Sequence, residues 1–234
     1  MARAWRGVGR LISQAKTGLS ALALKRHLGV SYPTAWLIHH KLMHAMAARE
    51  ERYVLSGQVQ VDDAYLGGQR SGGKAGRGSE NKVPFVAAVS LSDEGHPLRV
   101  NLSPVPGFTL EAVAVWASTN LAVGSTVCSD GLACFSAVTE AGCVHQPTVV
   151  AARKPKELPE FQWVNTVLGN LKTSLTGSYH AFAFRKYAAR YLAAFTYRVN
   201  RRFDLRTLHE RLLVAAARCG AQPEGTIRMA EVHC

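Results

Sequence analysis

The residues best suited to chemistry are aspartates that follow short apolar stretches. Asp62 and Asp63 come after the alternating stretch GQVQV, and Asp130 follows another short apolar stretch, in CSDGLACF. Hard cations such as Mg²⁺ prefer oxygen ligands and are usually bound by one or two carboxylates. Two such ions, about 3.5–4 Å apart, can stabilise both the attacking and the leaving oxygen of a phosphodiester. The chain has only sixteen acidic residues, so candidates for such a site are few.

The elements around these aspartates predict that they converge. The alternation from Gly57 predicts a first strand, and VPFVAAVSL and HPLRVNLS predict two more, which together form an antiparallel meander. Further along, the pattern predicts a helix from Thr109 through Trp116, a strand at Ser125–Ser129, a helix at Leu132–Ala141, a strand at Thr148–Val150, and helices at Val164–Leu175 and Phe182–Arg201. This order is that of the α/β RNase H-like fold, a mixed sheet flanked by helices, in which the first and fourth strands are neighbours. Asp130 followed by Gly131 is also compatible with a plain turn at the end of a strand.

The N-terminal segment predicts a helix-turn-helix. Apolar residues recur at helical spacing on both sides of the break LGVS within residues 17–46. Gly29 suits the turn, and Ser31 suits the N-cap of the second helix. In such a motif the second helix enters the major groove, so we expect Tyr32, Thr34 and His39 to face DNA. The alternative is a helical hairpin that only packs on the rest of the chain.

Composition favours a polyanionic partner. Lysine and arginine outnumber aspartate and glutamate by 28 to 16, a net charge of +12, which favours nucleic acid ahead of an anionic membrane surface. No apolar run reaches the roughly 18–20 residues that a spanning helix needs. The five cysteines include no C-x-x-C pair, so neither a disulfide framework nor a zinc site is predicted. We expect a cytoplasmic protein that does not insert into a membrane.

The basic C-terminal region adds candidate phosphate contacts. Its aromatic residues recur every three to four positions, which is typical of a helix face that packs in a core. The arginines between them would then line the solvent face and contact phosphates. The residues expected to do so are Arg198, Arg201 and Arg202.

Four ordered stretches together resemble a known family. VDDAYLGG, SDGLACF with His145 further on, WVNTVLGNLKTSLTGSYH and YRVNRRFDL are similar to the ISXO2-like catalytic domain of the IS1595 family of transposases. The likeness runs from about residue 57 to residue 213, and the segment containing LGVSYPTAW resembles the helix-turn-helix that precedes that domain. The expected organisation is a helix-turn-helix segment at 1–50, a catalytic domain at 57–213 and a C-terminal tail at 214–234.

The resemblance implies a catalytic set. It assigns the first and second metal-binding aspartates to Asp62 and Asp130, and it makes Asp63 a supporting residue. The third position, often a glutamate in related transposases, falls on Asn165, and the lysine seven residues later is Lys172, as in the DDNK variant of the family. Asparagine is a neutral oxygen ligand, so we expect weaker binding of the second metal ion than with three carboxylates. A structural alternative for Asn165 is a local cap at the start of a helix.

The resemblance also implies the activity and its partners. A transposase of this kind cleaves and joins DNA with Mg²⁺ or Mn²⁺, with two ions expected, and acts on transposon ends and target DNA as a homo-oligomer. Relatives commonly begin with a zinc ribbon that holds paired cysteines, and residues 1–16 contain no cysteine. We therefore expect either a truncated copy or one that works without this region. The alternatives are a nuclease that hydrolyses DNA without joining it, and an inactive remnant or regulator that only binds DNA through the helix-turn-helix.

Overall fold

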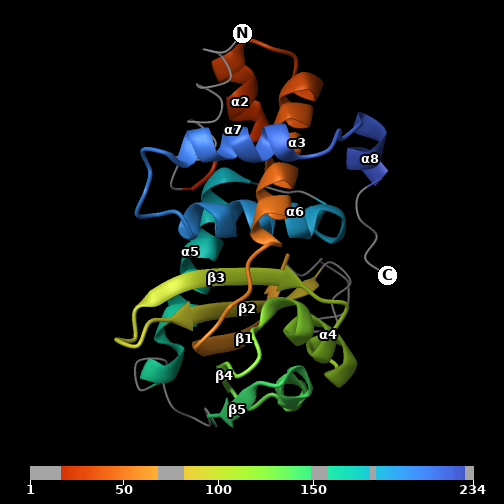
Figure 1. Cartoon of the computed structure of the whole chain (residues 1–234). Coiled ribbons are helices and arrows are strands. Elements are labelled where there is room, and N and C mark those ends of the chain that lie inside the picture. The colour runs from red at the N-terminus through yellow and green to blue at the C-terminus, as the bar shows by residue number, and fades with distance from the viewer. Residues whose placement is uncertain (1–16, 68–81, 149–157, 180–182, 230–234) are drawn as a thin grey trace. The chain divides into compact units, whose positions relative to one another are not determined.

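The computed structural model describes residues 17–67, 82–148, 158–179 and 183–229. The described residues form two compact units. One contains those between 53 and 170, and the other combines residues 17–52 with those from 171 to 229 (Figure 1). No helix within these ranges is both long enough and apolar enough to cross a membrane.

The unit at 53–170 contains a five-stranded mixed sheet. Its strands are β1 (Gln58–Leu66), β2 (Val83–Leu91), β3 (Pro97–Pro104), β4 (Thr126–Ser129) and β5 (Val144–Pro147). The sheet order is β3-β2-β1-β4-β5; β2 is antiparallel to β1 and β3, whereas β4 is parallel to β1 and β5. This is the RNase H-like arrangement, and the prediction that the first and fourth strands are neighbours is confirmed.

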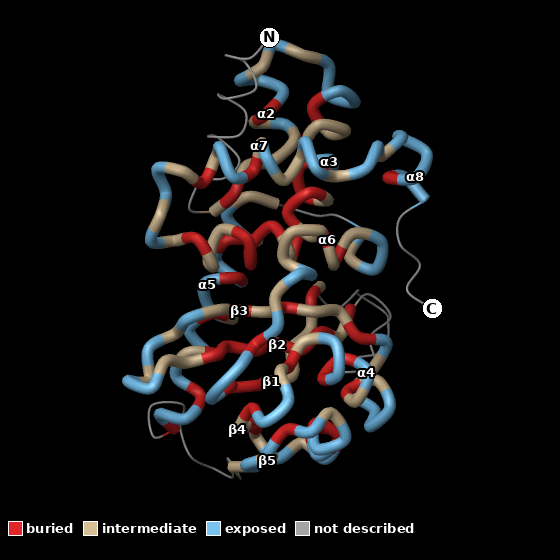
Figure 2. Tube along the Cα trace, viewed as in Figure 1, coloured by how far each residue is buried: buried red, intermediate tan, exposed pale blue. Residues whose placement is uncertain are grey.

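Alternating side chains of β1 face different surroundings. Val59 and Val61 are buried in a core with Val113 and Trp116 of helix α4 (Leu110–Asn120). Phe135 of the 3₁₀ helix η2 (Ala133–Ala141) joins the same core. The odd-numbered face of β1 is therefore covered by α4 and η2, which leaves the even-numbered face, with Gln60 and Asp62, for another element. Figure 2 shows how far the strands are buried.

Of the later elements predicted in this unit, one forms as expected and one is displaced. The helix predicted at Leu132–Ala141 is present as the 3₁₀ helix η2 (Ala133–Ala141). The fifth strand begins earlier than the predicted Thr148–Val150: Val144 pairs with Thr126, Thr148 follows the strand, and residues 149–150 lie outside the described residues. The prediction rested on the β-branched residues of TVV. The edge strand that forms is mostly exposed and contains no such run.

The second unit is entirely helical within the described ranges. It contains α2 (Ala21–Leu28), α3 (Tyr32–Glu50), α6 (Phe184–Val199), α7 (Leu208–Arg218), α8 (Glu224–Met229) and the last part of α5 (Gln162–Ser178). The two N-terminal helices and their turn are as predicted. Gly29 adopts the left-handed conformation, with φ of 65°, and the Ser31 side chain accepts a hydrogen bond from the Thr34 amide.

Helix α3 is the central element of this unit. It contacts α2, α6, α7 and α8, and its residues Leu42, Met43 and Met46 share one core with Leu208 and Leu212 of α7. The unit boundaries therefore differ from the expected domains, since residues 171–213 group with the N-terminal helices. The expected tail from residue 214 includes the end of α7 and all of α8. The reason is burial, because the apolar sides of α3 need the later helices to cover them.

Two buried histidines lie in an aromatic cluster within the helical unit. The ring of His40 lies 4.1 Å from the centroid of Trp36 and 4.7 Å from that of Tyr187, and the ring of His39 lies 6.3 Å from that of Tyr191. Burial, assisted by Arg198, lowers the pKa of His39 to about 4. Burial, assisted by His39, Arg190 and Arg228, lowers the pKa of His40 to about 3.

These lowered pKa values predict a loss of stability in acid. Below pH 6.5 the unfolded chain protonates His39 while the folded chain does not, so the free energy of unfolding falls as the pH drops towards 4, by about 3 kcal/mol for this residue. His39→Phe should melt with a shallower dependence on pH between 7 and 4. The same substitution at the exposed His27 serves as the control. Equal slopes for the wild-type protein and His39→Phe would contradict this account.

Candidate metal site

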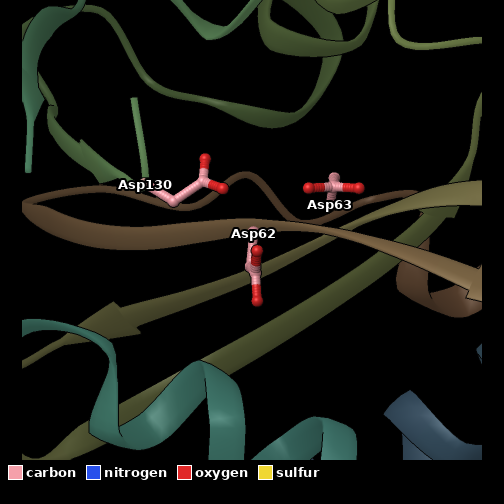
Figure 3. A group of neighbouring side chains, drawn as sticks. All are labelled: Asp62, Asp63 and Asp130. Atoms are coloured by element: carbon pink, nitrogen blue, oxygen red, sulfur yellow. The ribbon is translucent and has the colours of Figure 1, made fainter. Parts of the chain in front are cut away.

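Three aspartates lie together where β1 continues beyond the end of β4. Asp62, Asp63 and Asp130 each offer a carboxylate oxygen, and these oxygens lie within 4.8 Å of one another (Figure 3). All three residues are partly buried. Three carboxylates at this separation form a hard-oxygen donor set of the kind that binds Mg²⁺ or Mn²⁺.

Strand β1 supplies two of the three carboxylates, on opposite sides. Figure 3 shows Asp62 and Asp63 extending to opposite sides of β1, as the twofold alternation of a strand requires. Asp63 lies on the same face of β1 as Val61, which is in the core under α4 and η2. Asp62 lies on the same face of β1 as Gln60, whose side chain accepts hydrogen bonds from the start of α5. Asp62 is thus the aspartate that faces the same side as α5.

Asp130 reaches the cluster because β4 runs parallel to β1. Ser129, the last residue of β4, pairs with Val61 of β1, and the residue that follows each of them in the sequence is an aspartate. Gly131 then adopts a left-handed φ of 83°, and the Leu132 amide donates to Oδ1 of Asp130 over 3.1 Å. Asp130 therefore belongs both to a turn at the end of the strand and to the carboxylate cluster, so the two alternatives are not exclusive.

The turn that carries Asp130 is hydrogen-bonded through a serine and a histidine. The Ser129 hydroxyl is 2.8 Å from Nε2 of His145, and the Gly131 amide donates to the same hydroxyl over 3.4 Å. Burial lowers the pKa of His145. This arrangement ties the turn that carries Asp130 to β5.

Helix α5 carries the remaining predicted catalytic residues. It begins at Gln162, so Asn165 lies within the helix, three residues after its first residue, and the expected alternative of an N-terminal cap does not apply. Asn165 and Lys172 are both exposed and lie about two helical turns apart on this helix. The sequence patterns did not single out Gln60. The one available signal was a glutamine between two apolar strand residues, Val59 and Val61.

The three predicted groove-facing residues differ in accessibility. Tyr32 is 47% exposed, and Thr34 is also exposed, so the first turn of α3 presents both to solvent. His39 is 1% exposed, because α3 is covered on several sides by other helices. It lies within the protein core and does not reach the surface, so we remove it from the expected DNA contacts.

The three arginines also have different surroundings. Arg201 is buried, pairs with Glu50 and lies over the Tyr197 ring, 3.7 Å from its centroid. Arg201 therefore makes its ion pair inside the protein, whereas it was expected on the solvent face. Arg198 and Arg202 are half-buried: Arg198 donates to the Ser174 hydroxyl over 3.3 Å, and Arg202 donates to the Val199 carbonyl over 3.0 Å.

Comparison with known proteins gives one family. Residues 54–200 of the 234 match the ISXO2-like transposase domain. No curated protein matches.

Two solved structures show distant similarity. The crystal structure of the Mos1 strand transfer complex is 12% identical, with 93% of this chain and 78% of that chain covered and a TM-score of 0.31. The crystal structure of a pre-cleavage Mos1 transpososome is 11% identical, with 93% and 79% covered and a TM-score of 0.27. With TM-scores this low, the match over residues 54–200 is the informative finding.

Proposed function

The chain belongs to the ISXO2-like transposase domain family of DNA transposases, and from this premise we propose that it cleaves transposon ends and joins them to target DNA with divalent ions bound by Asp62, Asp130 and Asn165. The observation that carries the proposal is the carboxylate cluster formed by Asp62 and Asp63, within β1, and by Asp130, directly after β4. The family supplies the reaction, and the cluster supplies a donor set suited to it.

The choice of Asp62 over Asp63 as a ligand follows from the alternation of β1. The third ligand comes from α5, and the Gln60 side chain places the start of α5 on the even-numbered face of β1. Asp62 shares that face, whereas Asp63 faces the side covered by α4 and η2. Asp63 is then a supporting acid that adds negative charge beside the ligands.

Two Mg²⁺ or Mn²⁺ ions at this position would stabilise the charge on the attacking and leaving oxygens of the phosphodiester. The chain's own residues orient and balance this site. The Leu132 amide fixes the direction of the Asp130 carboxylate, and Asn165 contributes an oxygen without a charge. Lys172, exposed on the same helix as Asn165, contacts a DNA phosphate.

Fewer residues of the helical unit are proposed to contact DNA than the sequence predicted. The first turn of α3, with the exposed Tyr32 and Thr34, is the part that enters the groove, as the N-terminal residues of a recognition helix do. Arg198 and Arg202 remain phosphate contacts in this proposal, while His39 and Arg201 do not. We also propose that the protein acts in the cytoplasm as a homo-oligomer on DNA, because joining two transposon ends requires that they be held together.

A strand-transfer assay tests the proposal. The full chain is incubated with labelled candidate transposon ends, a target plasmid, and Mg²⁺ or Mn²⁺. Cleaved ends that become joined to the target support a transposase. Cleavage without joining would indicate a nuclease, and binding without cleavage would indicate an inactive remnant or a regulator.

A further inference from the structure

We propose that Gln60 is a positioning residue that sets where Asn165 lies relative to Asp62, an inference that rests on the function proposed above. The Gln60 side chain is 4% exposed, and its Oε1 accepts hydrogen bonds from two amides of α5, Trp163 over 3.0 Å and Val164 over 3.1 Å. One buried side chain of β1 therefore binds the start of the helix that carries the third proposed ligand.

These two amides need an acceptor from outside the helix. The first four amides of an α-helix have no partner within it, and α5 begins at Gln162, so Trp163 and Val164 are among them. Gln60 acts as a cap supplied from a strand more than a hundred residues earlier in the sequence. Such a bond fixes both the position and the direction of the helix start.

The path between the two proposed ligands through this bond is short. Asp62 and Gln60 are two residues apart on the same face of β1, about 6–7 Å along the strand. Asn165 directly follows Val164, which donates to Gln60. Metal sites need their ligands held to within about 0.5 Å of the productive geometry. A displacement of the helix start would therefore change the position of Asn165 relative to Asp62.

A second hydrogen bond holds the same helix start. The indole Nε1 of Trp163 donates to the Gly95 carbonyl over 2.8 Å, in the turn between β2 and β3. A cavity of about 280 Å³ is lined by Gln60, Trp163 and Gly95, which make these bonds, and also by polar residues that include Gln58 and Gln146. Since a cavity of this size admits water, the α5 amides can be hydrated when Gln60 is replaced. Substitution should therefore loosen the helix start more than it unfolds the unit.

The test compares Gln60→Leu, Gln60→Glu and the wild-type full chain. We measure the Mg²⁺ concentration for half-maximal cleavage and the hydrogen exchange of the peptide that contains the Trp163 and Val164 amides. Gln60→Leu should raise the Mg²⁺ midpoint about 10- to 100-fold, the range seen when partners of metal ligands are removed, and should speed exchange. Gln60→Glu should stay within about 3-fold of the wild type, because a carboxylate still accepts both bonds and suits a helix N-terminus.

Gln58→Leu is the matched control. Gln58 is the same residue type on the same face of the same strand, but it is exposed, so this variant should change neither readout. If Gln60→Leu does not fold, Trp163→Phe tests the same idea, because it removes only the bond to Gly95 and should also raise the Mg²⁺ midpoint and speed exchange.

Two results would overturn the inference. Faster exchange with an unchanged Mg²⁺ midpoint would mean that Gln60 is only structural, and unchanged exchange would mean that its bonds do not hold the helix start. A failure of the proposed function would be seen separately, as full cleavage by Asp62→Asn, since that result removes the metal site itself.

Discussion

Replacing Asp62 or Asp130 with asparagine is expected to reduce DNA cleavage by more than about 100-fold. Removing a residue that only hydrogen-bonds to a metal ligand typically lowers metal affinity or activity about 10- to 100-fold. Asp62 and Asp130 are the proposed ligands themselves. Asparagine keeps the size of the side chain, and in Asp130→Asn it keeps an oxygen that can accept from the Leu132 amide. The turn after β4 should therefore survive while the charge is lost.

DNA affinity should change little in both variants, because the proposed phosphate contacts come from other residues. The measurement is a gel shift in Ca²⁺ or without metal, beside a cleavage assay in Mg²⁺. Asp63→Asn is the matched control on the neighbouring residue of β1, and its effect should be about 10-fold or less because Asp63 faces the α4 side of the strand. Equal losses of binding and cleavage would make the aspartates structural. A larger loss in Asp63→Asn than in Asp62→Asn would exchange their roles.

The second large effect is expected at Asn165. Asn165→Ala removes the neutral oxygen and should reduce cleavage strongly, by at least about 10-fold. Asn165→Asp restores an oxygen and adds a charge, so it should keep part of the activity and lower the Mg²⁺ concentration for half-maximal cleavage. Metal titrations of the three proteins measure this directly.

Melting curves separate this role from a structural one. Asn165 is exposed and lies inside α5 rather than at its cap position, so Asn165→Ala should barely alter stability. The exposed Thr166, the next residue of the helix, provides the control variant Thr166→Ala, which should leave the metal dependence unchanged. If none of the Asn165 variants altered the metal dependence, Asn165 would be removed from the site.

Much of the site was predictable from local sequence. The alternation through Val59 and Val61 predicted β1, whereas the preference for Asp62 over Asp63 as a ligand came from the family resemblance alone. The order of the strands predicted that the end of β4 would lie beside β1, and the structure brings Asp130 to Asp62 in this way. The periodic pattern behind β1 has its cause within a few residues of the chain. The neighbouring position of β4, whose Ser129 pairs with Val61, was instead expected from the order of the elements along the whole domain.

The burial of the basic and aromatic residues could not be predicted in this way. Of the four aromatic residues whose spacing predicted a core face, Tyr191, Phe195 and Tyr197 are buried and Tyr187 is partly buried. The spacing did not predict that Arg201 is buried with Glu50, or that His39 lies under several helices. Whether a polar residue on a helix is exposed depends on how many other helices cover it, and the pattern of a single helix does not contain that number.

The sequence by itself determined the fold class, the family resemblance and the aspartates, because strand periodicity and short motifs are local properties. Only the tertiary structure decided which aspartate of β1 faces α5, since that depends on the bonds from Gln60 to Trp163 and Val164, across 103 and 104 positions of sequence. It also decided that the described residues from 171 to 229 form one compact unit with the N-terminal helices. The physical reason is the same in both cases: a buried amide or an apolar helix face needs a partner, and nothing local to the residue specifies which distant segment provides it.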